Sequence, residues 1–200
     1  MRNPYYESTI HKQIREKREN RKERIRNDVE RYGGEVLNSE EMQKAFEQTH
    51  HKRATVGEHS LRVTMSSVML CYALRKMKVK VNIPAVIIAA LCHDLGILGR
   101  SDKYSNAREC TAEHPKDSAA IARDIVENLP DNTEDIIERH MWPLGDSGAP
   151  NSIEGAIVSA ADKYSAVKDL VKGSSTDNES ISSLIPSERT EIKGEDNGEE

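Results

Sequence analysis

The most apolar stretch of the chain lies near its middle, between Pro84 and Gly96. Pro84 suits a first helical turn, where its missing N–H costs nothing, and Gly96 suits the residue after a last turn. The run is too short to span a bilayer and is apolar on every side. It therefore predicts a central helix buried in a bundle, with the polar residues His93 and Asp94 at its end.

Helical periodicity also precedes this central run. Residues 37–46 predict a short amphipathic helix that starts at Asn38 or Ser39, after the Gly33-Gly34 pair has ended the charged N-terminal segment. Residues 55–77 predict a long helix, because one stripe recurs at the helical repeat of about 3.6 residues. This stripe turns a histidine inward and consists of His59, Val63, Leu70, Leu74 and Met77.

The pattern weakens after Gly96 and then returns. Residues 99–113 have no clear periodicity and predict a loop of the length that usually carries function. We expect His114-Pro115 to open the next helix, with Pro115 in its first turn. Thr133 is expected to cap a short helix that turns His140 inward.

The last periodic segment runs from about Ser152 to Lys172 and has two stripes. One stripe is apolar, and the other, nearly opposite, is made of small residues and Asp162. Because small residues let neighbouring helices approach closely, we expect packing on both sides and a buried Asp162. The apolar stripe is Ile153, Ala156, Ile157, Ala160, Tyr164, Val167 and Val171, and the small one is Gly155, Ser159, Asp162 and Ala166.

Composition concentrates the core in the middle of the chain, because only 36% of the residues are hydrophobic while 32% are charged. Residues 11–31 are dense in Lys, Arg and Glu, which is typical of an exposed helix. Residues 173–200 contain too few apolar side chains to offset the entropy of ordering. The sequence thus predicts a basic helical extension over 1–35, a helical domain over 36–172 and a disordered acidic tail over 173–200.

The overall charge and the cysteines exclude several classes of protein. A formal net charge of −5 gives no overall signal for nucleic-acid binding. No run suits a membrane span, and the first residues lack the apolar core of a signal peptide. Cys71, Cys92 and Cys110 are odd in number and have no metal-ligand spacing, so we expect reduced thiols in a cytoplasmic protein.

Residues of the types that bind metals are predicted to face inward from separate helices. A buried carboxylate needs a cation, a proton or several donors, and the carboxyl end of a helix favours a cation. Mixed imidazole and carboxylate ligands suit a divalent transition metal better than Mg²⁺. No set of cysteine thiolates is present that could form a closed structural zinc site. A metal bound by these imidazole and carboxylate ligands should keep coordination positions for water, which indicates a hydrolytic centre. The candidate ligands are His59, His93, Asp94 and Asp162, followed by His114 and His140.

The order His59, His93-Asp94, Asp162 resembles the H…HD…D signature of the HD-domain metal-dependent phosphohydrolase superfamily. The likeness extends from about His50 to Lys172, and the stretch 140–144 resembles one in uncharacterised bacterial members. This resemblance implies an all-α, HD-domain helical bundle. It also implies hydrolysis of a phosphate ester or phosphodiester, often in a nucleotide, by a metal-activated hydroxide.

The resemblance further implies a ligand set for one or two divalent transition metal ions per chain. The candidate metals are Mn, Fe, Ni, Co and Zn. Asp94 would bridge the two ions and, with Lys163, take part in catalysis. The first ion would be held by His59, His93, Asp94 and Asp162, and the second by Asp94, His114 and His140.

The sequence departs from motifs that mark three known substrate specificities of the superfamily, so it favours none of these three. Ile97 stands where members that cleave cyclic dinucleotides often have Lys, and their Gly-Tyr-Pro motif is absent. Met141 stands where that branch tends to have another histidine. Leu98 and Gly99 replace the Glu-Asp pair that follows His-Asp in alarmone hydrolases.

Contacts to a phosphate group must then come from other side chains. Lys163, next to Asp162, is the first candidate, and Arg100 and Lys116 are either further candidates or surface charges. Trp142 either stacks on a base or packs at a helix end. Lys103 and Arg108 have the same two interpretations as Arg100.

The sequence thus predicts a metal-dependent phosphohydrolase that acts on a small-molecule phosphate ester or nucleotide. One alternative is a non-catalytic regulatory module that binds a nucleotide or metal, which the complete ligand set disfavours. Another is RNA association through residues 11–31 with a structural metal site. The acidic residues interleaved in that segment disfavour binding to nucleic acid.

Overall fold

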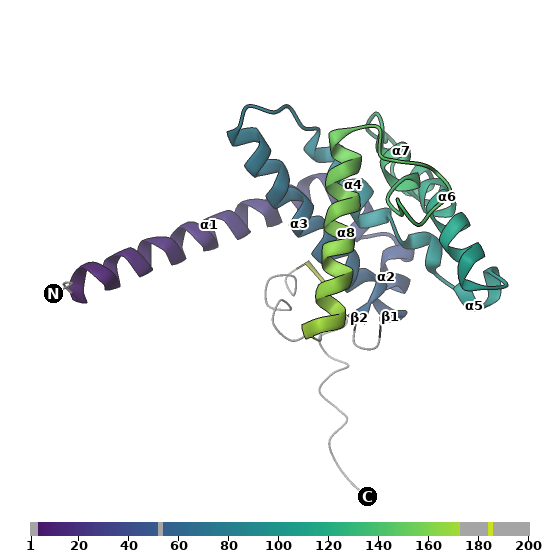
Figure 1. Cartoon of the computed structure of the whole chain (residues 1–200), viewed down its shortest axis with the longest axis horizontal. Helices are drawn as coiled ribbons and strands as arrows, with labels where there is room; N and C mark the ends of the chain where they lie inside the picture. Colours follow the sequence, from purple (N-terminus) through teal and green to yellow (C-terminus); the bar gives the residue numbers. More distant parts are fainter. Residues whose placement is uncertain (1–3, 52–53, 173–183, 186–200) are drawn as a thin grey trace, which may run out of the picture.

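The computed structural model describes residues 4–51, 54–172 and 184–185, and it confirms the all-α class (Figure 1). Its only strands within these residues form a two-stranded antiparallel pair. No described helix is long and apolar enough to cross a membrane. In chain order the elements are α1 (Pro4–Leu37), α2 (Glu40–Glu47), β1 (Thr49–His51), β2 (Ala54–Thr55), α3 (Val56–Lys76), α4 (Ile83–Cys92), the 3₁₀ helix η1 (Leu95–Ile97), α5 (Arg100–Lys103), α6 (Ala107–Ile125), α7 (Thr133–Glu138) and α8 (Ile153–Lys172).

Helix α4 is the centre of the bundle, as the apolar run predicts. Every residue of it except Pro84 is buried, and α1, α3, α6, α7 and α8 all pack against it. The Asn82 side chain caps its start by accepting from the Ala85 N–H. The helix ends at Cys92 rather than at Gly96, and the chain then turns through His93 and Asp94 into η1.

Gly96 is required by a close approach rather than by a helix end. A Cβ at this position would overlap the carbonyl oxygen of His114 and would lie 2.9 Å from the Ser118 nitrogen. The turn after α4 and the middle of α6 therefore touch through their backbones. This contact brings the residues after α4 next to His114.

The predicted helix over residues 55–77 is confirmed as α3. Thr55 and Glu58 form a capping box at its start, which satisfies two free N–H groups. The predicted inward stripe holds only for the first half, where His59 is buried. Leu70 is 43% exposed and Met77 is 73% exposed, because no helix among the described residues covers that side of the far end. Val68 and Cys71 are buried there instead.

The prediction that Gly33-Gly34 ends the first helix is wrong. Helix α1 continues through both glycines to Leu37. A Cβ at position 33 would overlap the Leu91 side chain, so Gly33 allows α1 to lie close to α4. Ser39 then caps α2, as expected, by accepting from the Met42 N–H.

The predicted loop over residues 99–113 is mostly helical. Helix α5 occupies its start, and α6 begins at Ala107, where Asn106 accepts from the Glu109 N–H. Pro115 consequently lies inside α6 and His114 does not precede a helix. The first turns of α6 bury no apolar stripe, so periodicity gave no signal for them.

Helix α7 starts one residue earlier than a Thr133 cap requires. Asn132 precedes it in a left-handed conformation, with a φ of 65°, and Thr133 is its first residue. The Thr133 hydroxyl donates to the Pro130 carbonyl instead. His140 follows the helix and is fully buried.

Helix α8 is packed on one side only, which corrects the expectation of two packed sides. Its small-residue stripe faces the core, with Gly155, Ser159 and Asp162 buried. Most of the described part of its apolar stripe faces outward, with Tyr164 and Val167 61% and 60% exposed, whereas Ile157 is buried. Small side chains let α8 lie close to α3 and α4, so this stripe is the inner one.

The predicted disordered tail, residues 173–200, lies outside the described residues except for Leu184 and Ile185. Leu184 is buried in the hydrophobic core, and Ile185 is partly buried against it. The domain boundaries over 1–35, 36–172 and 173–200 stay predictions.

Candidate metal centre

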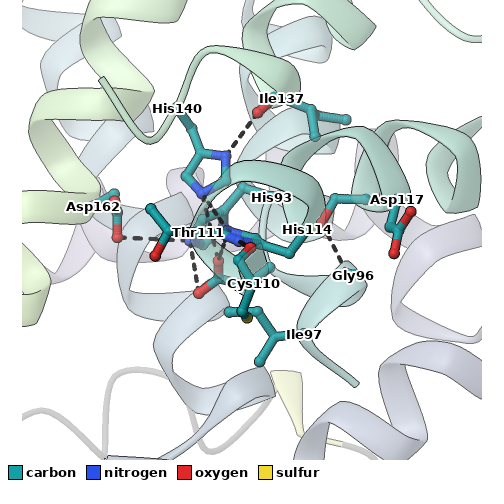
Figure 2. A network of polar contacts seen from close by, with 12 residues as sticks. His93, Gly96, Ile97, Cys110, Thr111, His114, Asp117, Ile137, His140 and Asp162 are labelled. Carbon is teal, nitrogen blue, oxygen red and sulfur yellow. Dashed lines mark hydrogen bonds and ion pairs between the residues drawn. The ribbon is translucent and has the colours of Figure 1, made fainter. Parts of the chain in front are cut away.

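The six candidate ligands converge at one buried site, although they come from five parts of the chain. Figure 2 labels four of them, His93, His114, His140 and Asp162. Helices α3, α6 and α8 each supply one residue, the turn between α4 and η1 supplies two, and the segment after α7 supplies one. None of the six is more than 9% exposed. This six-residue cluster consists of His59, His93, Asp94, His114, His140 and Asp162.

Asp94 divides its two carboxylate oxygens between two pairs of histidines. Its Oδ2 atom lies 3.4 Å from His93 Nε2 and 3.9 Å from His59 Nε2. Its Oδ1 atom lies 3.4 Å from His114 Nε2 and 3.5 Å from His140 Nε2. Asp94 therefore stands between two groups of nitrogen ligands, with one oxygen directed to each.

Asp162 belongs to the side of the cluster that holds His59 and His93. Its Oδ1 atom lies 3.0 Å from His59 Nε2 and 3.7 Å from His93 Nε2. These three residues have ligand atoms within 4.8 Å of one another, and so do His93, Asp94 and His140. Both groups are compact enough to surround a single ion.

Backbone carbonyls determine which nitrogen of three histidines carries the proton. The Nδ1 atoms of His93, His114 and His140 lie 2.9, 2.6 and 2.7 Å from the carbonyl oxygens of Ala90, Cys110 and Ile137. Figure 2 labels the last two of these partners. A carbonyl can only accept a hydrogen bond, so each Nδ1 donates its proton. Each neutral ring therefore turns an unprotonated Nε2 into the cluster, as metal-binding histidines do.

This arrangement of nitrogens fits a bound cation. His93 Nε2 is buried and has no hydrogen-bond partner among the described residues. His114 Nε2 and His140 Nε2 lie only 3.2 Å apart, although both are acceptors in these tautomers. A cation between such lone pairs removes their repulsion. The mixture of imidazole and carboxylate donors suits a divalent transition metal.

The charges of the cluster follow from burial and from its close neighbours. Burial lowers the pKa of His140, which keeps its ring neutral. Burial also acts to lower the pKa of His93, but Asp94 and Asp162 outweigh it and raise that pKa. Burial acts to raise the pKa of Asp162, but the close rings of His59, at 3.0 Å, and His93, at 3.7 Å, hold it well below its usual range. Asp162 is therefore an ionised carboxylate.

The turn that carries His93 and Asp94 is held by residues that sequence reasoning missed. Ser118 Oγ accepts from the Gly96 N–H at 2.8 Å. Gln48 donates to the Ile97 carbonyl at 3.1 Å and accepts from the Gly99 N–H at 2.8 Å. These side chains bind backbone groups far along the chain, and no local pattern signals such a contact.

Lys163 stands beside the cluster, as the sequence predicts. Its Nζ atom donates to the His140 carbonyl and lies 3.4 Å from Asp162 Oδ2. Ser159, one turn earlier on α8, also donates to the His140 carbonyl, at 2.9 Å. Helix α8 thus holds the backbone that positions the His140 ring.

A cavity of about 700 Å³ opens next to the six-residue cluster. Three cluster residues form part of its wall, together with Arg100 and Lys163. Much of the remaining lining is apolar, which suits the organic part of a ligand. The cavity is lined by Asp94, Ile97, Arg100, Tyr104, Asn106, Ala107, Cys110, Thr111, His114, Met141, Leu144, Asp162, Lys163 and Ala166.

The structure does not bring Lys116 or Trp142 into this lining. Lys116 is exposed on α6 and pairs with Glu113 at 3.1 Å. Trp142 is 47% exposed and lines a smaller, separate hollow of about 340 Å³ beside α8. Lys103 pairs with Asp117 at 3.3 Å, and Arg108 is exposed outside the cavity wall. Of the basic side chains proposed to bind phosphate, Arg100 and Lys163 line the cavity.

Comparison with known proteins agrees with this geometry. The family model described as HD domain matches residues 56–167, a segment that contains the whole six-residue cluster. Searches among curated proteins and among solved structures found no significant match. The family match covers more than half of the 200-residue chain. The chain therefore belongs to the HD domain family, within the superfamily of metal-dependent phosphohydrolases.

Proposed function

We propose that this protein hydrolyses a phosphate ester or phosphodiester of a small molecule, with a nucleotide as the expected class of substrate. One observation carries the proposal. The two oxygens of Asp94 point to two pairs of histidines, and the same residue forms part of the wall of a cavity of about 700 Å³. A carboxylate whose two oxygens face two groups of metal ligands, at the wall of a cavity large enough for a ligand, suits chemistry at a metal centre.

The ligand atoms support a site for two divalent transition metal ions that share Asp94. When bound, such ions polarise a phosphoryl oxygen and lower the pKa of water. The imidazole and carboxylate ligands are compatible with Mn, Fe, Ni, Co or Zn. One ion would be held by His59, His93, Asp94 and Asp162, and the other by Asp94, His114 and His140.

Two cations at the cavity wall, Arg100 and Lys163, would bind the phosphoryl group. Arg100 is exposed at the cavity wall and forms no ion pair within the part of the chain that the structure describes. Its guanidinium is therefore available for bidentate binding of phosphoryl oxygens. Lys163 lies closer to the cluster, next to Asp162, and would balance negative charge on the reacting phosphoryl group.

The remaining cavity wall would hold the organic part of the substrate. Ile97, Met141 and Leu144 offer apolar surface, and Tyr104 adds an aromatic ring. Apolar contacts of this kind exclude water from a bound ligand, which strengthens the charged contacts around its phosphoryl group. The wall is open to solvent on the other side, so a substrate can enter without rearrangement of the buried cluster.

The experiment is a turnover assay on protein that has been reconstituted with each candidate metal. A chromogenic phosphate monoester, a chromogenic diester and a panel of nucleotides serve as substrates. We expect Asp94→Asn to abolish turnover, because it removes the shared carboxylate charge. Lys116→Ala is the matched control and should keep the wild-type rate, because Lys116 lies outside the cavity wall.

Turnover by none of the metal and substrate combinations, in protein that binds metal and is folded, would contradict the proposal. Nucleotide binding in such a protein, measured by calorimetry, would instead identify the non-catalytic regulatory module. Equal rates in wild type and Asp94→Asn would place the activity outside the six-residue cluster.

A further inference from the structure

The first half of α1 carries a charge that the metal centre does not use. Residues 10–26 contain eight Lys or Arg and three Glu, a net charge of +5, whereas the whole chain carries −5. The remainder of the chain is therefore strongly acidic. Such segregation of charge between one helix and the body of a protein is an electrostatic feature that favours a polyanionic partner.

This part of α1 is not needed to cover the bundle. The helix projects away from the other elements, and every residue from 10 to 20 is exposed (Figure 1). Burial begins only at Ile25 and Val29. Most basic side chains before Ile25 can therefore meet a partner without any change in the fold, whereas Arg24 stacks on the Tyr72 ring.

The helix separates charges that alternate along the sequence. At about 100° per residue, Arg15, Arg18, Lys22 and Arg26 fall within about 80° of one another. No acidic residue of the segment falls within this basic stripe. The three glutamates, at positions 16, 19 and 23, form a stripe of their own beside it. The glutamates therefore repel a polyanion bound along the basic stripe less than their positions in the linear sequence suggest.

The described contacts leave most of the basic stripe available. Lys22 pairs with Glu19 at 3.3 Å, an exposed pair of little energetic weight. Arg15 and Arg18 form no ion pair with any residue that the structure describes. At the inner end, Arg26 Nε is buried and has no hydrogen-bond partner among these residues. Arg26 as a whole is only partly buried, so it forms the inner end of the basic stripe.

We propose that the basic stripe, Arg15, Arg18, Lys22 and Arg26, binds the phosphodiester backbone of a nucleic acid. The four cations extend along about 16 Å of helix, roughly one per turn, and can contact successive phosphates of one strand. This inference is independent of the proposed hydrolytic function, because none of these residues belongs to the cavity or the cluster.

Other anionic partners fit the surface less well. A membrane-binding helix needs an apolar face, and Ile10 and Ile14 are the only large apolar side chains exposed on this segment. A second copy of the chain offers acidic side chains, of which at least five are paired with basic neighbours in the same chain. Such pairs are Arg123–Glu134, Arg139–Asp135, Lys116–Glu113, Lys103–Asp117 and Lys44–Glu40.

The test measures binding of the full chain to labelled single-stranded RNA and DNA of about 20 nucleotides, by fluorescence anisotropy from about 50 to 300 mM KCl. Arg15→Gln with Arg18→Gln should weaken binding by about tenfold or more at low salt. The slope of log K against log salt should fall by about 1.4, since each lost phosphate contact contributes about 0.7.

Lys76→Gln with Lys80→Gln is the matched control, because both lysines are exposed and the net charge changes equally. The control should bind within about twofold of wild type. No binding by wild type at about 50 mM KCl, or equal losses in both variants, would overturn the proposal. It would also be overturned if the Arg15/Arg18 variant bound RNA and DNA normally but changed the sedimentation coefficient, which would identify a second copy as the partner.

Discussion

Substitution of Gly96 tests whether the backbone contact between the α4–η1 turn and α6 builds the metal centre. Gly96→Ala places a Cβ against the His114 carbonyl oxygen and 2.9 Å from the Ser118 nitrogen. Both neighbours are backbone atoms of α6, which cannot move away by a change of rotamer. Either α6 shifts and carries His114 out of the cluster, or the turn shifts and carries Asp94.

The expected cost is at the upper end of the range for overpacking, about 3 kcal/mol. A shift of the turn would also weaken the bond from the Gly96 N–H to Ser118 Oγ, which is 2.8 Å long in the structure. Loss of a partner for a buried N–H adds about 1–3 kcal/mol. For a chain of 200 residues, 3 kcal/mol corresponds to a decrease in Tm of about 6–12 °C.

Two other glycines calibrate this effect. At Gly33 a Cβ meets the end of the Leu91 side chain, which can rotate, so Gly33→Ala should cost less than Gly96→Ala. At Gly34 nothing lies within 4 Å of the added Cβ, and the residue is inside α1. Gly34→Ala should therefore stabilise the protein by about 0.5–1 kcal/mol, through helix propensity.

The assay is thermal unfolding followed by circular dichroism, combined with elemental analysis of each variant after reconstitution. We expect Tm to be highest in Gly34→Ala, followed by wild type, then Gly33→Ala, and lowest in Gly96→Ala. The metal content should be reduced only in Gly96→Ala. A Gly96→Ala protein with wild-type Tm and metal content would refute the reasoning, since the turn and α6 would then tolerate separation.

Three further predictions follow from the cluster and the cavity. His114→Ala and His140→Ala should each keep the fold and one metal ion but lower turnover by at least about 100-fold, with non-additive effects in the double variant. Chelation should lower Tm by about 5–11 °C, because metal at about 100 times its Kd contributes roughly 2.7 kcal/mol. Iodoacetamide should modify Cys110 first and block turnover, because Cys110 lines the cavity whereas Cys71 and Cys92 are buried. Burial raises the pKa of all three thiols, to about 12 for Cys71, so access rather than pKa decides the order of labelling.

Each of these has an outcome that would contradict it. Near-wild-type turnover in both histidine variants would show that only one metal ion is needed for turnover. An unchanged Tm after elemental analysis has verified removal of the metal would show that the ions do not support the fold. Equal labelling of Cys71 and Cys110, read by peptide mass spectrometry, would show that the core opens as readily as the cavity.

Much of the fold was predictable because its signals are local. The apolar run before His93 can only be buried, whichever helices surround it. The caps at Ser39 and Thr55 act within three residues of themselves, so they are visible in the sequence. The candidate ligands could be named for a related reason, since a buried imidazole or carboxylate at a helix end requires a partner wherever the helix lies.

Other features were decided by which surfaces meet. The two stripes of α8 both suit an inner face, and the close approach of α3 and α4 places the stripe of small residues inward. Gly33 would end an isolated helix, but packing against Leu91 makes a glycine favourable in the middle of α1. The first turns of α6 carry no apolar pattern because the cavity, rather than the core, lies beside them.

By itself, the sequence determined that a buried central helix leads into His93-Asp94 and that four further residues of ligand type accompany it. Only the tertiary structure decided that both oxygens of Asp94 have nitrogen neighbours, and that His114 and His140 face each other at 3.2 Å. Those distances depend on how α4, α6, α8 and the segment after α7 pack together. Packing between helices far apart in the chain is set by the shapes of whole surfaces, which no single segment encodes.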